Sequence, residues 1–191
     1  MNQDEIIQLF KDSHALLQGH FKLTSGRHSD IYYEKFTLLK QPVLCTRICQ
    51  QMAVNFKDAG AVTVVGPTTG GIIIAYDVAR YLGIEAIYAE AAEGSGREFK
   101  RGFSLEKGQK VVIVDDVLTT GKSIFEVIEL VNSYEAEIVG IGLMLDRSNG
   151  KVSFDYPYFA LATVDADSWE PDQCPLCKKG EGITQRGSRK F

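Results

Sequence analysis

One stretch, residues 111–123, constrains the fold of this chain more than any other. It begins with four apolar residues, as in a strand that is buried on both faces. Two adjacent carboxylates, Asp115 and Asp116, come next, followed by small hydroxyl residues, a glycine and the predicted start of a helix at Thr119. A strand–loop–helix unit of this kind is typical of a parallel sheet that binds its ligand at the carboxyl ends of the strands.

The same alternation of strand and helix runs through the rest of the chain. Helices are predicted at 1–20, 42–58, 72–82 and 119–133, and strands at 62–65, 86–89, 110–115, 138–145 and 159–164, with two short strand-like pieces before them at 21–24 and 31–33. Near-continuous Val and Ile in the later strands indicates helices on both faces. We therefore expect an α/β fold, a parallel sheet of about five strands in a single domain covering 1–191.

Composition excludes several classes of protein. With 45% hydrophobic and 24% charged residues the chain can form a substantial core, and a net charge of −4 gives no bulk attraction to nucleic acid. No apolar run reaches the roughly 18 residues of a membrane span. The N-terminus has no basic-then-apolar export signal, and four cysteines are too few for a disulfide scaffold. We expect a cytoplasmic enzyme with reduced thiols and with neither nucleic acid nor membrane as partner.

The loop at 119–123 has the features of a phosphate site. It offers backbone N–H groups, hydroxyls and a helix N-terminus. Asp115 and Asp116 would repel a bare phosphate, but a ribose phosphate suits both parts, because the acids can bind its hydroxyls while the loop binds its 5-phosphate. A capped helix after a strand would explain the run more simply, although a cap needs only one such residue. A P-loop is excluded, since it requires glycine at the position of Asp116.

At this point the run at 111–123 resembles the phosphoribosyl pyrophosphate motif of the type I phosphoribosyltransferases. Three other segments are similar to the branch of that family that acts on orotate. They are its N-terminal hood motif at 19–29, its pyrophosphate loop at 66–71, and the strand end with an orotate-binding arginine at 145–147. The resemblance covers about residues 17–147 in the right order. It implies a small hood within residues 1–40, beside a basic C-terminal extension at 171–191.

The resemblance also implies a reaction. Ribose 5-phosphate passes from phosphoribosyl pyrophosphate to orotate, giving orotidine 5′-phosphate and pyrophosphate, in pyrimidine biosynthesis. It implies Mg²⁺ bound mainly through the substrate, and a homodimer in which loop 90–104 reaches the partner's site. The residues expected at phosphoribosyl pyrophosphate are Thr68, Thr69, Gly70, Arg97, Asp115, Asp116, Val117, Leu118, Thr119, Thr120, Gly121, Lys122 and Ser123; those expected at orotate are Thr24, Tyr32, Tyr33, Thr119 and Arg147.

The chain departs from the family pattern in its cations. Gly70 and Thr24 stand where many members carry lysine, and loop 90–104 lacks the usual histidine. Because the departing pyrophosphate gains negative charge, we expect Lys100 and Arg101 of this loop to act in catalysis together with Asp115 and Asp116.

Two other functions stay open. The chain could be a type I transferase for another base, or a non-catalytic regulator that binds phosphoribosyl pyrophosphate. Arg147 and the hood favour a base that carries a carboxylate. A regulator would need a nucleic-acid-binding element, and the basic tail has no helix-turn-helix pattern.

The cysteines fall into two pairs. Cys45 and Cys49 lie on a predicted helix, and Cys174 and Cys177 have zinc-knuckle spacing. Four thiolates could hold zinc, but two unrelated pairs of reduced thiols is the favoured interpretation. The three histidines, His14, His20 and His28, have no metal-ligand spacing in the sequence.

Overall fold

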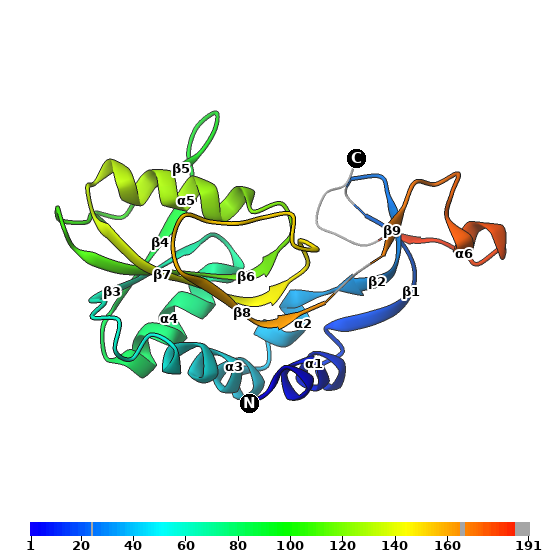
Figure 1. The fold of residues 1–191 in the computed structure, drawn as a ribbon, viewed down its shortest axis with the longest axis horizontal. Helices are drawn as coiled ribbons and strands as arrows, with labels where there is room; N and C mark the ends of the chain where they lie inside the picture. The colour runs from blue at the N-terminus through cyan, green and yellow to red at the C-terminus, as the bar shows by residue number, and fades with distance from the viewer. Residues whose placement is uncertain (24, 165–166, 186–191) are drawn as a thin grey trace.

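A six-stranded sheet forms the body of the molecule in the computed structural model, which describes residues 1–23, 25–164 and 167–185 (Figure 1). The strand order is β5-β4-β3-β6-β7-β8. All strands run parallel except β5, which pairs antiparallel with β4. The bounds are β3 Thr63–Pro67, β4 Glu85–Ala91, β5 Arg97–Glu98, β6 Lys110–Leu118, β7 Glu137–Asp146 and β8 Tyr158–Thr163. The predicted parallel sheet is thus confirmed.

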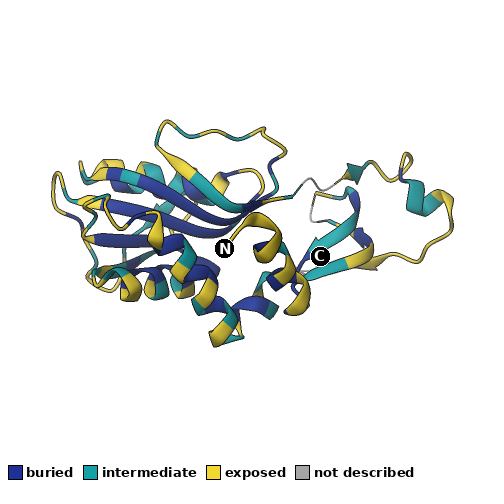
Figure 2. Ribbon diagram, turned by 60° about the horizontal axis from the view of Figure 1, so that its bottom comes forward, coloured by how far each residue is buried: buried dark blue, intermediate teal, exposed yellow. Residues whose placement is uncertain are grey.

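Helices cover both faces of this sheet, and its strands are buried between them (Figure 2). In β6, Val112 and Val114 pack into the cluster formed with the first four helices, whereas Val111 and Ile113 pack into the cluster formed with α5. This alternation follows from the two-residue period of a strand. The helices are α1 Gln3–Asp12, α2 Lys35–Leu39, α3 Pro42–Val54, α4 Gly70–Leu82 and α5 Lys122–Ser133.

A second, smaller sheet makes the hood at one end of the molecule (Figure 1). Its order is β10-β1-β2-β9, and the two central strands form an antiparallel hairpin. The outer strands come from the C-terminal part of the chain, which also carries the short α6. The bounds are β1 Leu16–Lys22, β2 His28–Tyr33, β9 Ser168–Trp169, α6 Pro175–Lys178 and β10 Thr184–Gln185.

Several boundaries differ from the sequence prediction; the helix expected over 42–58, for instance, ends at Val54. The helix expected over 1–20 ends at Asp12, and Leu16 and Leu17 pair with β2 instead, because the chain turns at His14, whose φ is 55°. Strand β6 runs to Leu118 and α5 begins only at Lys122. No predicted helix or strand covers 90–104, but the paired residues of the β4–β5 hairpin lie within this stretch. Among the described residues, no helix has both the length and the apolar character needed to cross a bilayer.

Candidate active site

The two carboxylates are buried near the carboxyl end of the central strand β6. Asp115 is 8% exposed and Asp116 3% exposed. Each carboxylate is fixed by the next peptide group: Asp115 Oδ1 accepts from the Asp116 N–H at 2.8 Å, and Asp116 Oδ1 accepts from the Val117 N–H at 2.7 Å. The strand therefore holds an acid pair with defined orientation at the edge where an open parallel sheet binds ligands.

Burial sets the protonation of this pair. Burial and, after it, the neighbouring charge of Asp116 together raise the pKa of Asp115 to about 8, although the backbone N–H of Asp116, Lys35 and Arg97 act in the opposite direction. Two adjacent carboxylates in a low-dielectric place do not both ionise easily. One acid of the pair thus holds its proton near neutral pH until a ligand brings compensating charge or hydrogen bonds.

Lys35 is a site residue that the sequence analysis missed. Its Nζ lies 2.9 Å from Oδ1 and 2.8 Å from Oδ2 of Asp116. A single lysine at the start of α2 belongs to no motif, and no signal in the sequence distinguishes it from a surface lysine. The contact arises because the chain leaves the hood strand β2 at Tyr33 and enters α2 directly above the acid pair.

Gly70 explains why the cation comes from Lys35. A Cβ at position 70 would lie 2.0 Å from Oδ2 of Asp116, so any side chain there would displace the carboxylate. The lysine that many type I transferases carry in this loop is therefore incompatible with the position that Asp116 adopts here. Lys35 supplies a positive charge from the hood side of the same carboxylate.

The expected phosphate loop forms a small pocket. Its volume is ≈ 60 Å³, which suits a single phosphate group rather than a whole nucleotide. Gly121 precedes α5 with φ 74°, and a Cβ there would come within 2.9 Å of Phe125 and Val152. Glycine is thus required for the chain to enter the helix, whose N-terminal N–H groups favour anions. The lining residues are Asp115, Val117, Leu118, Thr119, Thr120, Gly121, Lys122, Ser123 and Ile124.

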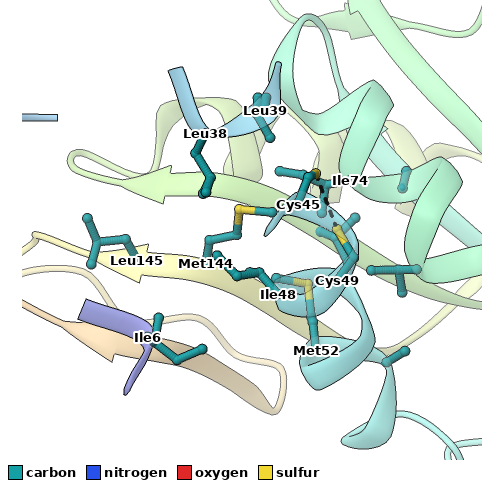
Figure 3. Packing of buried hydrophobic residues seen from close by; sticks show 14 of the residues in the cluster. Ile6, Leu38, Leu39, Cys45, Ile48, Cys49, Met52, Ile74, Met144 and Leu145 are labelled. Atoms are coloured by element: carbon teal, nitrogen blue, oxygen red, sulfur yellow. Dashed lines mark hydrogen bonds between the residues drawn. The ribbon is translucent and has the colours of Figure 1, made fainter. Parts of the chain in front are cut away.

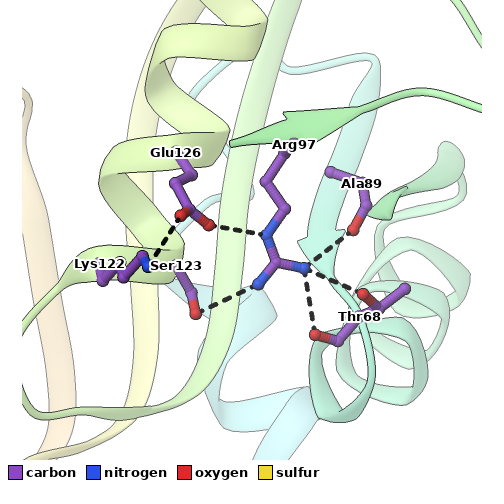
Figure 4. A network of polar contacts seen from close by, with 6 residues as sticks. All are labelled: Thr68, Ala89, Arg97, Lys122, Ser123 and Glu126. Carbon is purple, nitrogen blue, oxygen red and sulfur yellow. Dashed lines mark hydrogen bonds and ion pairs between the residues drawn. The ribbon is translucent and has the colours of Figure 1, made fainter. Parts of the chain in front are cut away.

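Arg97 joins the two predicted phosphate loops (Figure 4). Its guanidinium donates to the carbonyl and hydroxyl oxygens of Thr68 at 3.2 and 2.9 Å, and to the hydroxyl of Ser123 at 3.3 Å. It also donates to the carbonyl of Ala89 and pairs with Glu126. Most of its donors are therefore used by the protein, which makes Arg97 a positioning residue for both loops.

The first of these loops has its own geometry. The peptide bond between Thr68 and Thr69 is cis, and the Thr68 N–H donates to the carbonyl of Ala89 at 2.9 Å. Thr69 is exposed at the N-cap of α4, which begins at Gly70 rather than at the predicted Ile72.

Arg147 follows β7 at the same sheet edge. Its N–H donates to the carbonyl of Leu118 at 2.8 Å, so it lies beside the end of β6. Its guanidinium stands over the ring of Tyr33 at 4.6 Å. The buried Nε of Arg147, the hydroxyl of Tyr33 and the hydroxyl of Ser148 have no hydrogen-bond partner among the described residues.

These unpaired groups are free to bind a polar ligand, and buried polar atoms are nearly always hydrogen-bonded. Burial raises the pKa of Tyr33 to about 12, so its hydroxyl keeps the proton that it can donate. Burial lowers the pKa of the Arg147 guanidinium from its ordinary value, which means that an anion bound there would relieve a desolvated charge. Tyr33 lies against Arg147, and Lys35 lies against Asp116. The short segment 33–35 therefore supplies two side chains to the carboxyl edge of the sheet.

The remaining predicted residues are less closely joined to this edge. Tyr32 packs on Phe21, with ring centroids 5.6 Å apart. Lys100 pairs with Glu98 at 3.1 Å and Arg101 with Glu90 at 3.1 Å, so both ion pairs stay within the β4–β5 hairpin and the turn after it. Thr24 lies outside the described residues.

The two cysteine pairs lie in different parts of the fold, as the favoured interpretation predicts. The alternative, a single zinc site formed by all four thiolates, is wrong. Cys45 and Cys49 lie on the buried face of α3, with their sulfurs 3.9 Å apart (Figure 3). Cys174 and Cys177 lie at α6 in the hood, where they meet two histidines. All four are free thiols.

Comparison with known proteins shows which family this chain belongs to. The model of the phosphoribosyl transferase domain matches residues 37–177, and the fold, a parallel sheet with an acid pair at its central strand end, is that of the type I phosphoribosyltransferases. The orotate phosphoribosyltransferases of Desulforamulus reducens and Caldicellulosiruptor bescii are each 44% identical to this chain over the whole length of both. The crystal structure of the orotate phosphoribosyltransferase from Aeropyrum pernix matches with a TM-score of 0.70 at 25% identity, covering 83% of this chain and 93% of that one. The chain therefore belongs to the phosphoribosyltransferase family, within its orotate phosphoribosyltransferase branch.

Proposed function

We propose that this chain transfers ribose 5-phosphate from phosphoribosyl pyrophosphate to a ring nitrogen of orotate, with orotidine 5′-phosphate and pyrophosphate as products. The observation that carries the choice of base is the buried, unpaired Nε of Arg147 next to the Tyr33 hydroxyl. A planar guanidinium suits a carboxylate, which it can bind through two hydrogen bonds. Orotate carries such a carboxylate, and uracil, adenine and hypoxanthine do not.

The acid pair would stabilise the sugar as it reacts. When pyrophosphate leaves, positive charge develops at C1 of the ribose, and Asp115 and Asp116 would hold the hydroxyls of that ring from the carboxyl end of β6. Hydrogen bonds from those hydroxyls favour the ionised form of Asp115, opposing the effect of burial. Lys35 adds positive charge against the carboxylate of Asp116, whose Oδ2 occupies the space beside Gly70.

The phosphate loop would bind the 5-phosphate through the N–H groups at the start of α5. Arg97 holds that loop at Ser123 and the opposite loop at Thr68, so both ends of the sugar substrate meet a fixed surface. Orotate is an anion and already nucleophilic, so the chain needs no strong general base beside Arg147.

The residues present fit Mg²⁺ bound mainly through the substrate. The acid pair offers carboxylate oxygens, but Lys35 already lies against Asp116, so the protein supplies only part of an oxygen shell. Magnesium commonly binds in this way, through one or two carboxylates, waters and substrate phosphates. When bound it neutralises charge on the pyrophosphate.

We further propose a homodimer. Large apolar side chains are exposed on the face made by α2, α3 and α4, among them Phe36, Val43, Ile73 and Tyr76. Beside them runs an apolar groove of ≈ 360 Å³. Burying such a patch against a second copy would remove it from water. The loop at 90–104 would then serve the partner's site, since the ion pairs of Lys100 and Arg101 stay within their own hairpin region.

The domain division and the compartment are part of the same proposal. Residues 1–40 and the described residues 168–185 would act as one hood within a single domain covering 1–191, because β9 and β10 pair with β2 and β1. The free thiols suit a reducing cytoplasm.

The test is an assay of pyrophosphate release with orotate, uracil, adenine and hypoxanthine in turn, together with Arg147→Ala. We expect orotate alone to react. Arg147→Ala should weaken orotate binding by about 1.5–3 kcal/mol, the contribution of a hydrogen bond to a charged group, with phosphoribosyl pyrophosphate binding nearly unchanged. Arg47→Ala, at an exposed position on α3, is the matched control.

Each contrary result has a meaning. Preference for a purine would assign the chain to another base. Binding of phosphoribosyl pyrophosphate without turnover of any base would support the regulator. If Arg147→Ala instead weakens the sugar phosphate, Arg147 does not bind the base.

A further inference from the structure

Four metal-binding side chains meet in the hood, apart from the acid pair. They are His20 on β1, His28 on β2, and Cys174 and Cys177 at the start and within α6. One ligand atom from each lies within 4.8 Å of every other. The zinc-knuckle spacing of Cys174 and Cys177 is visible in the sequence, but their histidine partners are not. His20 and His28 are eight positions apart on the two strands of a hairpin, and they lie about 150 positions before the cysteines.

The spacing of these atoms fits a single tetrahedral ion. His20 Nε2 lies 3.0 Å from His28 Nδ1, and the sulfur–nitrogen distances are 3.5 Å from Cys174 to His20, and 3.7 and 3.3 Å from Cys177 to His20 and His28. A tetrahedral Zn²⁺ at the usual bond lengths separates its nitrogen and sulfur ligands by roughly 3.3–3.8 Å. The cluster is therefore already close to the size of a zinc coordination sphere.

The orientation of His20 supports the same interpretation. Its Nδ1 lies 2.8 Å from the carbonyl oxygen of Glu181, which fixes the proton on Nδ1. Nε2, facing both cysteines, then carries the lone pair. Metal-binding histidines are commonly oriented by such a backbone carbonyl on the nitrogen that does not bind the metal.

Burial and charge also fit. His20 and His28 are each 3% exposed and Cys174 is fully buried, with Cys177 partly exposed. Two thiolates and two neutral imidazoles balance the charge of one divalent ion. The arrangement offers four protein ligands, as in a structural site rather than a catalytic one.

The segment around α6 needs such a support. Helix α6 spans only Pro175–Lys178 and buries no residue of its own. The strands that tie this part of the chain to the hood, β9 and β10, are two residues each. A bound ion would anchor this segment where apolar packing is lacking.

We propose that the hood binds one structural Zn²⁺ through His20 Nε2, His28 Nδ1 and the sulfurs of Cys174 and Cys177. The ion joins the C-terminal segment to the hairpin β1–β2. Because β2 ends at Tyr33, against Arg147, the ion also stiffens the strand that leads into the base end of the active site. The proposal rests on the hood alone and does not depend on the reaction.

The experiment measures metal binding directly. The untagged full chain is stripped with chelator under reducing conditions and titrated with Co²⁺, which reports tetrahedral thiolate ligation by its visible and thiolate charge-transfer absorption. We expect one Co²⁺ per chain, displaced by one Zn²⁺. The double variant Cys174→Ser, Cys177→Ser should lose this absorption, and Cys45→Ala with Cys49→Ala, which removes the other two thiols, should keep it.

A second variant guards against misfolding of the first. His28→Cys keeps four ligands, so it should still bind one Co²⁺ and strengthen the thiolate band. Zinc should also raise the Tm of the wild type and leave that of the Cys174, Cys177 variant unchanged. Failure of the reduced wild type to bind Co²⁺, a disulfide between Cys174 and Cys177 that persists in reductant, or Co²⁺ absorption that survives their replacement would each overturn the proposal.

Discussion

At the scale of single residues, Lys35 is the cation that contacts the acid pair. The side chain of Lys35 is 38% exposed and that of Asp116 is 4% exposed, so the ion pair lies at the boundary between solvent and the buried strand end. The energy of such a pair is modest for stability, because solvent screens the exposed partner. The effect of Lys35 on the reaction should be larger, because charge develops beside it in a place from which water is excluded, and electrostatic interactions are stronger there.

Lys35→Met is therefore expected to lower kcat/KM at least tenfold with little change in Tm. In the wild type, the positive charge of Lys35 would attract the departing pyrophosphate and would offset the negative charge of Asp116. Lys40→Met, at the exposed C-cap of the same helix, is the control and should behave as the wild type. Equal activity of the two variants would show that Lys35 is a surface lysine with an incidental contact.

Asp115 predicts a pH dependence of stability. Its pKa is raised to about 8 in the folded chain from the model-peptide value of 3.8, chiefly by burial. Between these values the folded state binds a proton that the unfolded state has lost, so the contribution of Asp115 is present below pH 3.8 and is lost as pH rises toward 8. Asp115→Asn, which removes this ionisation, should thus raise the Tm of the ligand-free chain more at pH 8 than at pH 5. A Tm difference that is the same at both values would mean that Asp115 titrates normally.

The residue scale is also where prediction from sequence was least complete. Asp115, Asp116 and the loop after them stand in one continuous run, so their pattern is visible without a structure. Lys35 reaches Asp116 across 81 positions of sequence, and nothing local marks it. In the sequence, Gly70 is noticeable only because many family members carry lysine at that position. The steric reason for the glycine is contact with the carboxylate of Asp116, which only the folded structure reveals.

At the scale of elements, Arg97 links β5, the end of β4, the loop at Thr68 and the start of α5. Arg97→Lys keeps the charge but loses the planar fork of donors that reaches these partners together. We expect the KM for phosphoribosyl pyrophosphate to rise about tenfold, which corresponds to about 1.4 kcal/mol, the scale of one or two lost hydrogen bonds. The KM for orotate should change less.

The matched control is Arg80→Lys on α4, where an exposed arginine pairs with Asp77 one turn away. It should leave both KM values unchanged. If Arg97→Lys also leaves them unchanged, the two loops hold their positions without this link.

The parallel strands and their helices were predictable because each carries a long apolar pattern. The first helix was extended too far, since Leu16 and Leu17 continue a helical spacing although they belong to β1. The two-residue strands β5, β9 and β10 have no periodicity to detect. Their positions follow from tertiary pairing, which a local pattern does not contain.

At the scale of the whole molecule, the hood brings together segments from both ends of the chain. β1 pairs with β10 and β2 with β9, and the cluster of His20, His28, Cys174 and Cys177 brings α6 against β1 and β2. The sequence predicted the hairpin of the hood but not its completion by the C-terminal part. The same holds for the active site, whose acid pair and Arg147 were predicted as separate motifs. The segment that holds Tyr33 and Lys35 connects the two, because Tyr33 contacts Arg147 and Lys35 contacts Asp116.

The arrangement of the predicted dimer determines how the loop at 90–104 acts. Within one chain, Lys100 and Arg101 pair with Glu98 and Glu90 rather than with the acid pair. If these cations serve catalysis, the site that they serve is expected to be the partner's. Two inactive variants can then correct each other: one with Lys100→Ala and Arg101→Ala, the other with Asp116→Asn.

Each variant alone should have low turnover and near wild-type Tm, because one lacks the loop cations and the other an acid of the site. Mixed after partial denaturation and refolding, they should regain about a quarter of wild-type activity, since random pairing gives half mixed dimers and each mixed dimer holds one complete site. Size-exclusion chromatography with light scattering confirms that dimers are present. If the loop acted within its own chain, the mixture would stay as inactive as its parts, because no site would then combine an intact loop with an intact acid pair. If the loop variant alone turned over like the wild type, the charge of the departing pyrophosphate would be met elsewhere, with Lys35 the nearest cation to Asp116.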